Sequence, residues 1–293
     1  MAAEGAANEF RHCFDVKGAK DGSRFSLSQN QRRKQMLMKQ RERMENKLEN
    51  LRAAAIAADP EPTEDDQDQM NTVETTESSN PEESMDTDAA VKPKRKKRNL
   101  LMKHELLEEI PTDLREEWVC MPIPEGQRCL VASSNQQTIA KSETGELLEK
   151  FRSYLPNGSH SSSDKKESYC VFDCIYHDPS STFYILDMMC WRGNLYYNCD
   201  AAFRSFFMHT KLSEIPYVSQ ITDNNPYRFV ALPAFECTTQ GITNACNPAS
   251  IGLPPTVVTF YNRNTHYTTG ETNPLVCYLP IDRIPPLLQT LNQ

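Results

Sequence analysis

The stretch YCVFDCIYHDPSSTFYILDMMCW, residues 169–191, decides the fold of the C-terminal part of the chain. Two runs rich in aromatic and β-branched residues flank His177–Ser181, where Asp, Pro and Ser favour a turn. Each run is mostly apolar at successive positions, so both faces of each strand are expected to be buried. The stretch therefore predicts a hairpin of two central strands.

Weaker signals on either side of this hairpin extend the pattern. Strand-like runs lie at residues 116–121, 128–132, 256–261 and 274–279, and short helical runs at residues 105–109, 144–154, 201–211 and 284–291. Strands and helices are mixed without a regular βαβ alternation, and strands prevail. The predicted fold is a strand-dominated α+β domain over residues 99–293.

The cysteines raise the question of a metal site. Cys170, Cys174, His177 and Cys190 are close in sequence, but a C-x3-C-x2-H spacing differs from the paired C-x2-C units of zinc sites. On a strand, Cys170 and Cys174 point to one face and His177 to the other. We interpret the cysteines as small core thiols, reduced in the cytoplasm or nucleus, and predict neither a metal site nor a cofactor.

Charge is distributed unevenly along this chain of net charge −8. Residues 24–52 carry nine Lys and Arg against three Asp and Glu, whereas residues 59–88 carry twelve acids and no base. Residues 92–98, KPKRKKR, then hold six bases in seven positions. These changes predict a flexible start (1–23), a basic helix (24–58), a disordered acidic linker that ends in a basic cluster (59–98) and the domain (99–293).

Neither a secretory signal nor a membrane-spanning segment is expected. The opening residues MAAEGAANEF have neither the basic start nor the apolar run of a secretory signal. No window approaches the roughly 18 consecutive apolar residues that indicate a membrane span.

The basic segment has the marks of one long helix. It contains no Gly or Pro between Gly22 and Pro60, and Ser28 with Gln31 fits a capping box at its start. A narrow apolar stripe follows helical spacing at Leu37, Met44, Leu48, Leu51 and Ala55. A stripe this narrow leaves four readings open: a solvated or coiled-coil helix, a membrane-surface helix, a nucleic-acid-binding helix, or a helix enclosed by an acidic groove.

One of these readings is favoured by resemblance. The stretch RFSLSQNQRRKQMLMKQRERMENKLENLR resembles the importin-β-binding domain of the snurportin family, whose S-L-x-Q-x-x-R-R motif matches residues 26–33. The resemblance implies that importin-β encloses the basic helix, with charge complementarity supplying fast and salt-sensitive capture. The residues expected to bind importin-β are Arg24, Arg32, Arg33, Lys34, Lys39, Arg41, Arg43, Lys47 and Arg52.

Two further segments carry transport signals of lower specificity. Ala6, Phe10, Phe14 and Val16 have the spacing of a leucine-rich export signal, and the resemblance implies an export-receptor epitope at this end. A disordered start with two phenylalanines is the alternative. The cluster at residues 92–98 has the form of a short nuclear-import signal, or of a solvated linker.

The domain carries the second half of the resemblance. DCIYHDPSSTFYILDMMCWRGNLYYNC, EEWVCMPIPEGQRCLVAS and TFYNRNTHYTTGETNPLV are similar to the cap-binding domain of snurportins, in the same order along the chain. The resemblance implies an adaptor that binds the 2,2,7-trimethylguanosine cap of spliceosomal U snRNAs and their particles (snRNPs) and shuttles between cytoplasm and nucleus.

An enzyme is the natural rival, because that family is similar in fold to the GTP-binding part of mRNA guanylyltransferases. Those enzymes attack GTP with the lysine of K-x-D-G-x-R, and the matching position here is Ile123. Their D-G-E motif aligns with residues 173–175, DCI, and their E-G-x-x-F motif with residues 256–260, TVVTF, so both glutamates are absent. The lysine of their C-terminal K-W-K motif aligns with Cys277. The resemblance therefore implies a retained guanine pocket without catalytic residues.

The same resemblance assigns a set of cap-binding residues. A methylated guanine is a flat cation, which stacks well on an aromatic face, and Tyr278 occupies the stacking position. Lys141 matches a phosphate-binding lysine, and Leu106 lies where the family has a second tryptophan. The full set is His104, Leu106, Gln127, Arg128, Cys129, Lys141 and Tyr278.

These departures from the family leave alternatives open. A monomethyl cap or a protein could be the cargo instead, since Leu106 and Tyr278 replace two tryptophans. A coiled-coil scaffold at residues 28–52 or a degenerate guanylyltransferase relative are the remaining readings.

Overall fold

A computed structural model describes residues 27–57, 99–160 and 168–292. The chain divides into two compact units, one formed by residues 1–40 with 97–293 and the other by residues 41–96. The predicted export epitope, Arg24, the acidic linker and the basic cluster lie outside the described residues. Over the ranges that the structure describes, no helix is both long and apolar enough to cross a bilayer.

The first sheet has five strands in the order β1-β12-β11-β2-β10. Its strands are β1 (Lys103–Leu106), β2 (Trp118–Pro124), β10 (Phe235–Glu236), β11 (Pro255–Asn262) and β12 (Thr272–Pro280). The strand β1 is at the edge and pairs in parallel with β12, while the other pairs are antiparallel. The β1–β12 register passes from His104↔Asn273 to Glu105↔Cys277, so residues 274–276 form an irregularity in β12.

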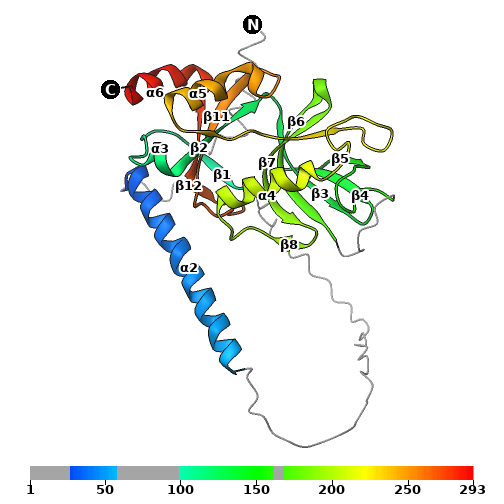
Figure 1. Cartoon of the computed structure of the whole chain (residues 1–293), viewed down its shortest axis with the longest axis horizontal. Coiled ribbons are helices and arrows are strands. Elements are labelled where there is room, and N and C mark those ends of the chain that lie inside the picture. The colour runs from blue at the N-terminus through cyan, green and yellow to red at the C-terminus, as the bar shows by residue number, and fades with distance from the viewer. Residues whose placement is uncertain (1–26, 58–98, 161–167, 293) are drawn as a thin grey trace, which may run out of the picture. The chain divides into compact units, whose positions relative to one another are not determined.

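The second sheet has seven strands (Figure 1). Its path is β5-β4-β3-β6-β7-β8, and β9 pairs in parallel with β7. The strands are β3 (Gln127–Ser134), β4 (Gln137–Ser142), β5 (Leu147–Phe151), β6 (Cys170–His177), β7 (Thr182–Trp191), β8 (Asn194–Leu195) and β9 (Arg228–Ala231). The predicted hairpin is confirmed as β6 and β7, joined by the short helix η2 (Asp178–Ser180), and every residue of β7 is buried.

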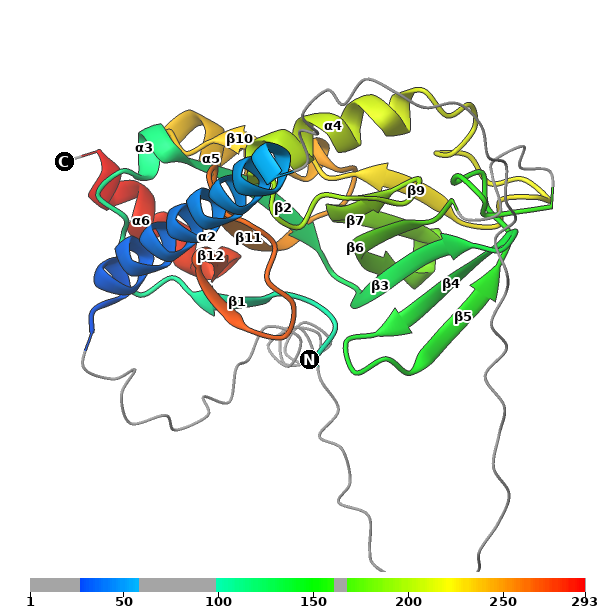
Figure 2. The same cartoon turned by 90° about the horizontal axis from the view of Figure 1, so that it is seen from below.

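Three apolar clusters hold these layers together. An inter-sheet core, with Met121 and Ile123 from one sheet and Tyr184 and Leu186 from the other, joins the two sheets. A second cluster lies between the seven-stranded sheet and α4 (Ala201–Ser213), and a third between the five-stranded sheet and the helices α5 (Thr239–Cys246) and α6 (Ile284–Leu291). Figure 2 shows the two sheets side by side in this arrangement. The strand-dominated α+β fold is therefore confirmed.

Three further elements of the described domain residues are short. They are α3 (Leu114–Glu117), η3 (Pro248–Ser250) and η4 (Ile281–Arg283).

Two predicted helices are wrong. Residues 105–109 begin inside β1, because pairing with β12, far away in sequence, outweighs the helical preference of the run Glu-Leu-Leu-Glu-Glu. Residues 144–154 contain β5, which pairs with β4 as an exposed edge strand. Both errors concern edge strands, whose polar faces weaken the alternation that marks a strand.

The basic segment forms α2 (Gln29–Ala57), as predicted. The capping box is present, since Gln31 donates its backbone N–H to the Ser28 hydroxyl at 3.3 Å and Ser28 donates its own to the Gln31 side chain at 3.0 Å. The predicted apolar stripe is not buried as a unit: Leu37 and Met44 are half-buried, and Leu48 is 47% exposed.

Candidate functional site

A buried ion pair lies between the sheets. Arg128 on β3 donates to both carboxylate oxygens of Asp173 on β6, at 3.0 and 2.6 Å. The Tyr267 hydroxyl donates to the same carboxylate at 2.8 Å. Burial opposes the charge on Arg128, but Asp173 outweighs it and the pKa of Arg128 is raised. The arginine therefore remains charged and is neutralised by its partner.

A second ion pair continues this network toward α4. Arg204 binds Asp187 on β7 at 2.8 and 2.7 Å, and its guanidinium lies 5.9 Å from the centre of the Tyr267 ring. Burial raises the pKa of Tyr267 and of Tyr261 well above that of a free tyrosine, so both hydroxyls stay protonated. Two ion pairs and two tyrosines thus tie together both sheets and a helix.

His104 joins this network from β1. Its Nε2 lies 3.1 Å from Arg128 Nη2 and 3.3 Å from the Tyr261 hydroxyl. Burial, reinforced by the charge of Arg128, lowers the pKa of His104 well below its usual value. Because a guanidinium can only donate, the neutral imidazole accepts at Nε2 and carries its proton on Nδ1.

Tyr278 and Leu106 border the same inter-sheet core. They are register partners on β12 and β1, and Tyr278 is 7% exposed. Alternation along β1 places His104 and Leu106 on one face of the strand. Three of the predicted cap-binding residues are thus brought together on the five-stranded sheet.

The other predicted residues lie on the seven-stranded sheet, on two different faces. Lys141 pairs with Leu130, which contacts the inter-sheet core, so Lys141 shares a face with Arg128. Cys129 is buried in the cluster under α4, where burial raises its pKa, and Gln127 shares its face. Any contact of Gln127 or Cys129 with a ligand between the sheets would come from the main chain.

Glu143 is a residue of this region that the sequence did not single out. One carboxylate oxygen accepts from Asn99 Nδ2 at 2.7 Å, and the other is buried with no hydrogen-bond partner. Burial raises the pKa of Glu143, and the charge of Arg128 opposes this shift. No motif marks this position, because only the return of β4 toward the segment before β1 gives it these neighbours.

Cys170, Cys174 and Cys190 are buried core thiols, as interpreted from the sequence. His177 instead contacts the Ser180 hydroxyl at 2.7 Å. Within the described parts of the chain, no group of three or more His, Cys, Asp and Glu side chains has the arrangement of a metal site.

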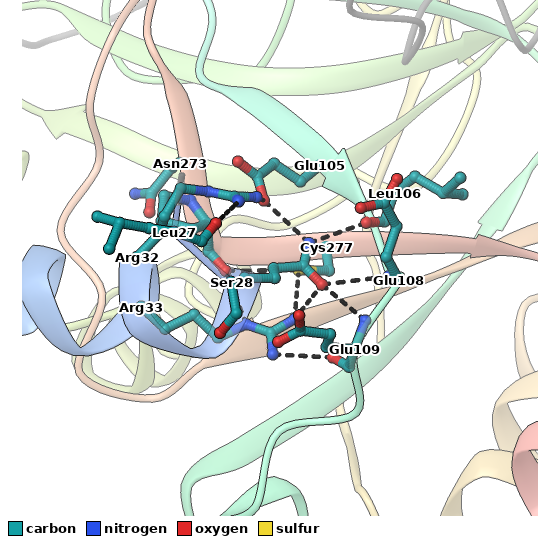
Figure 3. A network of polar contacts seen from close by, with 12 residues as sticks. Leu27, Ser28, Arg32, Arg33, Glu105, Leu106, Glu108, Glu109, Asn273 and Cys277 are labelled. Carbon is teal, nitrogen blue, oxygen red and sulfur yellow. Dashed lines mark hydrogen bonds and ion pairs between the residues drawn. The ribbon is translucent and has the colours of Figure 1, made fainter. Parts of the chain in front are cut away.

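The start of α2 contacts the domain through a second polar network, shown in Figure 3. Gln29 is 2% exposed, and its Nε2 donates to the Glu105 carboxylate and to the Leu106 carbonyl, both at 2.9 Å. Its Oε1 accepts the backbone N–H groups of Glu108 and Glu109 at 3.1 and 3.0 Å. The side-chain amide therefore binds main-chain groups at the end of β1 and just beyond it.

Arg33 lies one turn further along α2 and is 4% exposed. Its five N–H donors reach Pro274 O, Asn30 Oδ1, Glu109 O, Gln29 Oε1 and Cys277 Sγ, at 3.3, 2.7, 2.8, 2.7 and 3.5 Å. Its guanidinium also lies 5.4 Å from the centre of the Trp118 ring. Burial raises the pKa of Cys277 to about 11, so the sulfur that faces Arg33 is a neutral thiol.

Two ionic contacts complete this interface. Arg32 forms an ion pair with Glu105 at 2.8 Å. Glu109 accepts the Asn30 backbone N–H at 3.0 Å, and hydrogen bonds of this kind from the helix start lower the pKa of Glu109.

The other described basic residues of the set predicted to bind importin-β are exposed. They are Lys34, Lys39, Arg41, Arg43, Lys47 and Arg52. The described members of the predicted set therefore divide into an engaged pair, Arg32 and Arg33, and six exposed residues, while Arg24 lies outside the described residues.

Comparison with solved structures finds DNA ligases. The ligase domain of LigD from M. tuberculosis is 14% identical, with a TM-score of 0.41 over 62% of this chain and 59% of that one. A mycobacterial DNA ligase D complexed with ATP and MES is 15% identical, with a TM-score of 0.42 over 62% and 60%. This chain thus spans about three fifths of the length of either, and similarity at this level carries no argument about its activity.

Comparison with protein families is more specific. The family model described as the Snurportin1 m3G cap-binding domain matches residues 100–280, which is more than half of the chain. The match includes both sheets and the segments that carry His104, Arg128 and Tyr278. The chain therefore belongs to the family of the snurportin m3G cap-binding domain.

Proposed function

We propose that this protein is a nuclear import adaptor that binds the trimethylguanosine cap of spliceosomal U snRNAs, free or in snRNPs, and links them to importin-β. The observation that carries the proposal is the family match over residues 100–280 in a chain whose α2 presents six exposed Lys and Arg side chains. An adaptor needs these two parts, one for cargo and one for a receptor.

Cap binding in this proposal uses the face that carries Tyr278 and His104. The methylated guanine stacks on Tyr278, where a cation over an aromatic ring contributes roughly 0.5–2 kcal/mol. Lys141 binds the phosphates, while Arg128, neutralised by Asp173, supports the wall of the site. His104, Tyr278 and Arg128 are all buried, so the ligand enters by rearranging their surroundings.

The proposal includes no covalent step. The position that would hold a nucleophilic lysine is Ile123, which is fully buried in the inter-sheet core. Incubation with labelled GTP and a divalent metal is expected to give no covalent adduct. A stable adduct would reverse the assignment in favour of a guanylyltransferase.

The decisive experiment is a titration of the whole chain with trimethylguanosine cap analogue, followed by protein fluorescence. The Tyr278→Ala variant should lose roughly 2- to 30-fold in affinity, the equivalent of the stacking contribution. A chain that binds no methylated cap would refute the proposal.

A monomethyl cap is the second candidate ligand, because Leu106 offers no aromatic face beside Tyr278. Competition between trimethyl and monomethyl analogues distinguishes the two. Preference for the monomethyl form would replace the cargo and leave the adaptor role intact.

For the receptor, we propose that importin-β encloses the basic helix from its first turn, Arg32 and Arg33 included. Changing Lys39, Arg43 and Lys47 together to Ala should abolish importin-β binding and its salt dependence. The same role implies shuttling between cytoplasm and nucleus, and return through an export receptor that binds residues 6–16.

A further inference from the structure

The start of α2 contacts the domain through residues that also belong to the import arm. We propose that this surface of the domain is an intramolecular receptor for Gln29 and Arg33, and that it withholds the start of the arm from an acidic protein partner until the helix is released. The inference rests on the proposed function, because it concerns the regulation of the same arm.

The contact has the features of a built interface. A buried arginine is tolerated only when its charge and donors are satisfied. All five donors of Arg33 have acceptors, and its charge interacts with the Glu109 carboxylate. The buried face of α2 is polar, with Gln29 and Arg33 one turn apart, while the apolar Met38 is 70% exposed. A nonspecific hydrophobic contact would instead bury apolar residues such as Met38 and leave the polar ones exposed.

The receptor combines main-chain groups at a sheet edge with the side chains of Glu105 and Cys277. Gln29 binds the end of β1, and Arg33 binds Pro274 O in the irregular segment of β12. Recognition therefore depends on the geometry of two particular side chains rather than on net positive charge. The other basic residues of α2 cannot replace them.

Glu109 adds a specific contribution from the domain. Its carboxylate accepts the Asn30 N–H, one of the N-terminal donors that an α-helix leaves without a partner inside the helix. A negative charge at this place also interacts favourably with the helix dipole. The domain thus stabilises the helical form of the segment that it binds.

Gln29 and Arg33 cannot bind the domain and importin-β at the same time. A groove that encloses the arm needs the same donors that the domain occupies, and Arg33 has none to spare. The apparent affinity of the partner is then reduced by the undocked fraction of the chain.

The test compares Glu109→Ala with Glu108→Ala in the full chain. Glu108 is the matched control, since its side chain is exposed and it contributes to the docking only through its backbone N–H. Hydrogen exchange in residues 27–40 should accelerate roughly tenfold in Glu109→Ala, as expected for the loss of a charged helix cap, and should match the wild type in Glu108→Ala. Equal exchange in all three proteins would overturn the docking.

Titration with importin-β supplies the second readout. Its affinity should rise in Glu109→Ala by the same factor as the exchange rate and stay unchanged in Glu108→Ala, because both quantities follow the undocked fraction. Faster exchange with unchanged affinity would overturn the withholding. If importin-β bound none of the three, the receptor assignment and the competition would both fail, while the exchange rates would still decide whether the helix docks.

Discussion

The Glu109 carboxylate accepts a hydrogen bond from the Asn30 backbone N–H at 3.0 Å, across 79 positions of sequence. A side chain of the domain thus takes part in defining where α2 begins, together with the local capping box of Ser28 and Gln31. A segment with the composition of an independent arm is in this way attached to the fold at its first turn.

This hydrogen bond should make the docking of α2 sensitive to acid. The contact lowers the pKa of Glu109 below its ordinary 4.5, so the docked form binds fewer protons. Docking is therefore strongest above pH 4.5 and weakens as the pH falls through the lowered value. Arg33 lies over the Trp118 ring, so Trp118 fluorescence should change in this pH window when the helix leaves the domain. A Trp191→Phe background removes the signal of the second tryptophan of the chain.

Glu109→Gln should abolish that acid transition, because no carboxyl remains to titrate. An identical transition in Glu109→Gln would assign it to another group.

Cys277 should report docking through its reactivity. Its thiol is buried against Gln29 and Arg33 with a pKa of about 11, and both features suppress alkylation. Changing Gln29 and Arg33 together to Ala should raise its iodoacetamide labelling severalfold at pH 8. Peptide mass spectrometry measures this, with the half-buried Cys246 as the internal reference. Unchanged labelling of Cys277 would contradict the docked arrangement.

The ion pair between the sheets should be costly to break. Asp173→Asn leaves the buried charge of Arg128 without a counter-charge, which should lower the free energy of unfolding by about 3–5 kcal/mol in urea titrations. Replacing both partners, Arg128→Met with Asp173→Leu, should restore much of this loss, since the buried charges are then gone. A single variant as stable as the wild type would show that the pair is not essential to the fold.

Ionisation of Glu143 should lower the free energy of unfolding, whereas ionisation of Glu109 favours the docking of α2. Its pKa is raised in the folded state, so between pH 4.5 and the raised value the folded protein binds more protons than the unfolded chain. Its contribution to stability therefore declines as pH rises through that window. Urea unfolding of wild type and Glu143→Gln at several pH values measures the difference, which should grow in favour of Glu143→Gln toward neutral pH. A difference independent of pH would refute this.

Tyr278→Trp should tighten cap binding, because a larger π-face attracts a cationic ring more strongly. Tyr278→Phe is the control and should bind within about twofold of wild type if stacking, and not the hydroxyl, provides the contact. Titration with trimethylguanosine cap analogue measures both. Weaker binding by Tyr278→Trp would argue against stacking at this position.

The elements that the sequence predicted well are those with strong local signals. The β6–β7 hairpin is apolar throughout and has a Pro-containing turn, and the capping box is a four-residue pattern, so both follow from neighbouring residues alone. The family resemblance of the domain also rests on contiguous stretches and is confirmed.

The elements that were missed depend on residues far apart in the chain. The strand β1 exists because β12 pairs with it, and residues 105–109, predicted as a helix, carry no sign of that partner. The sequence analysis likewise did not single out Gln29 and assigned Arg33 to importin-β binding, because their contacts with the domain come from residues far away in the chain. Glu143 gained its buried carboxylate in the same way, from Asn99 and Arg128.

The binding of Gln29 at β1 has a practical consequence for work on fragments. An exposed strand edge is a template for pairing with another chain, and natural sheets cover such edges. Here Gln29, 77 positions earlier in the sequence, covers the end of that edge at Leu106. A truncated protein that starts at residue 99 would expose the open edge of β1, and oligomers formed there could be mistaken for a property of the intact molecule.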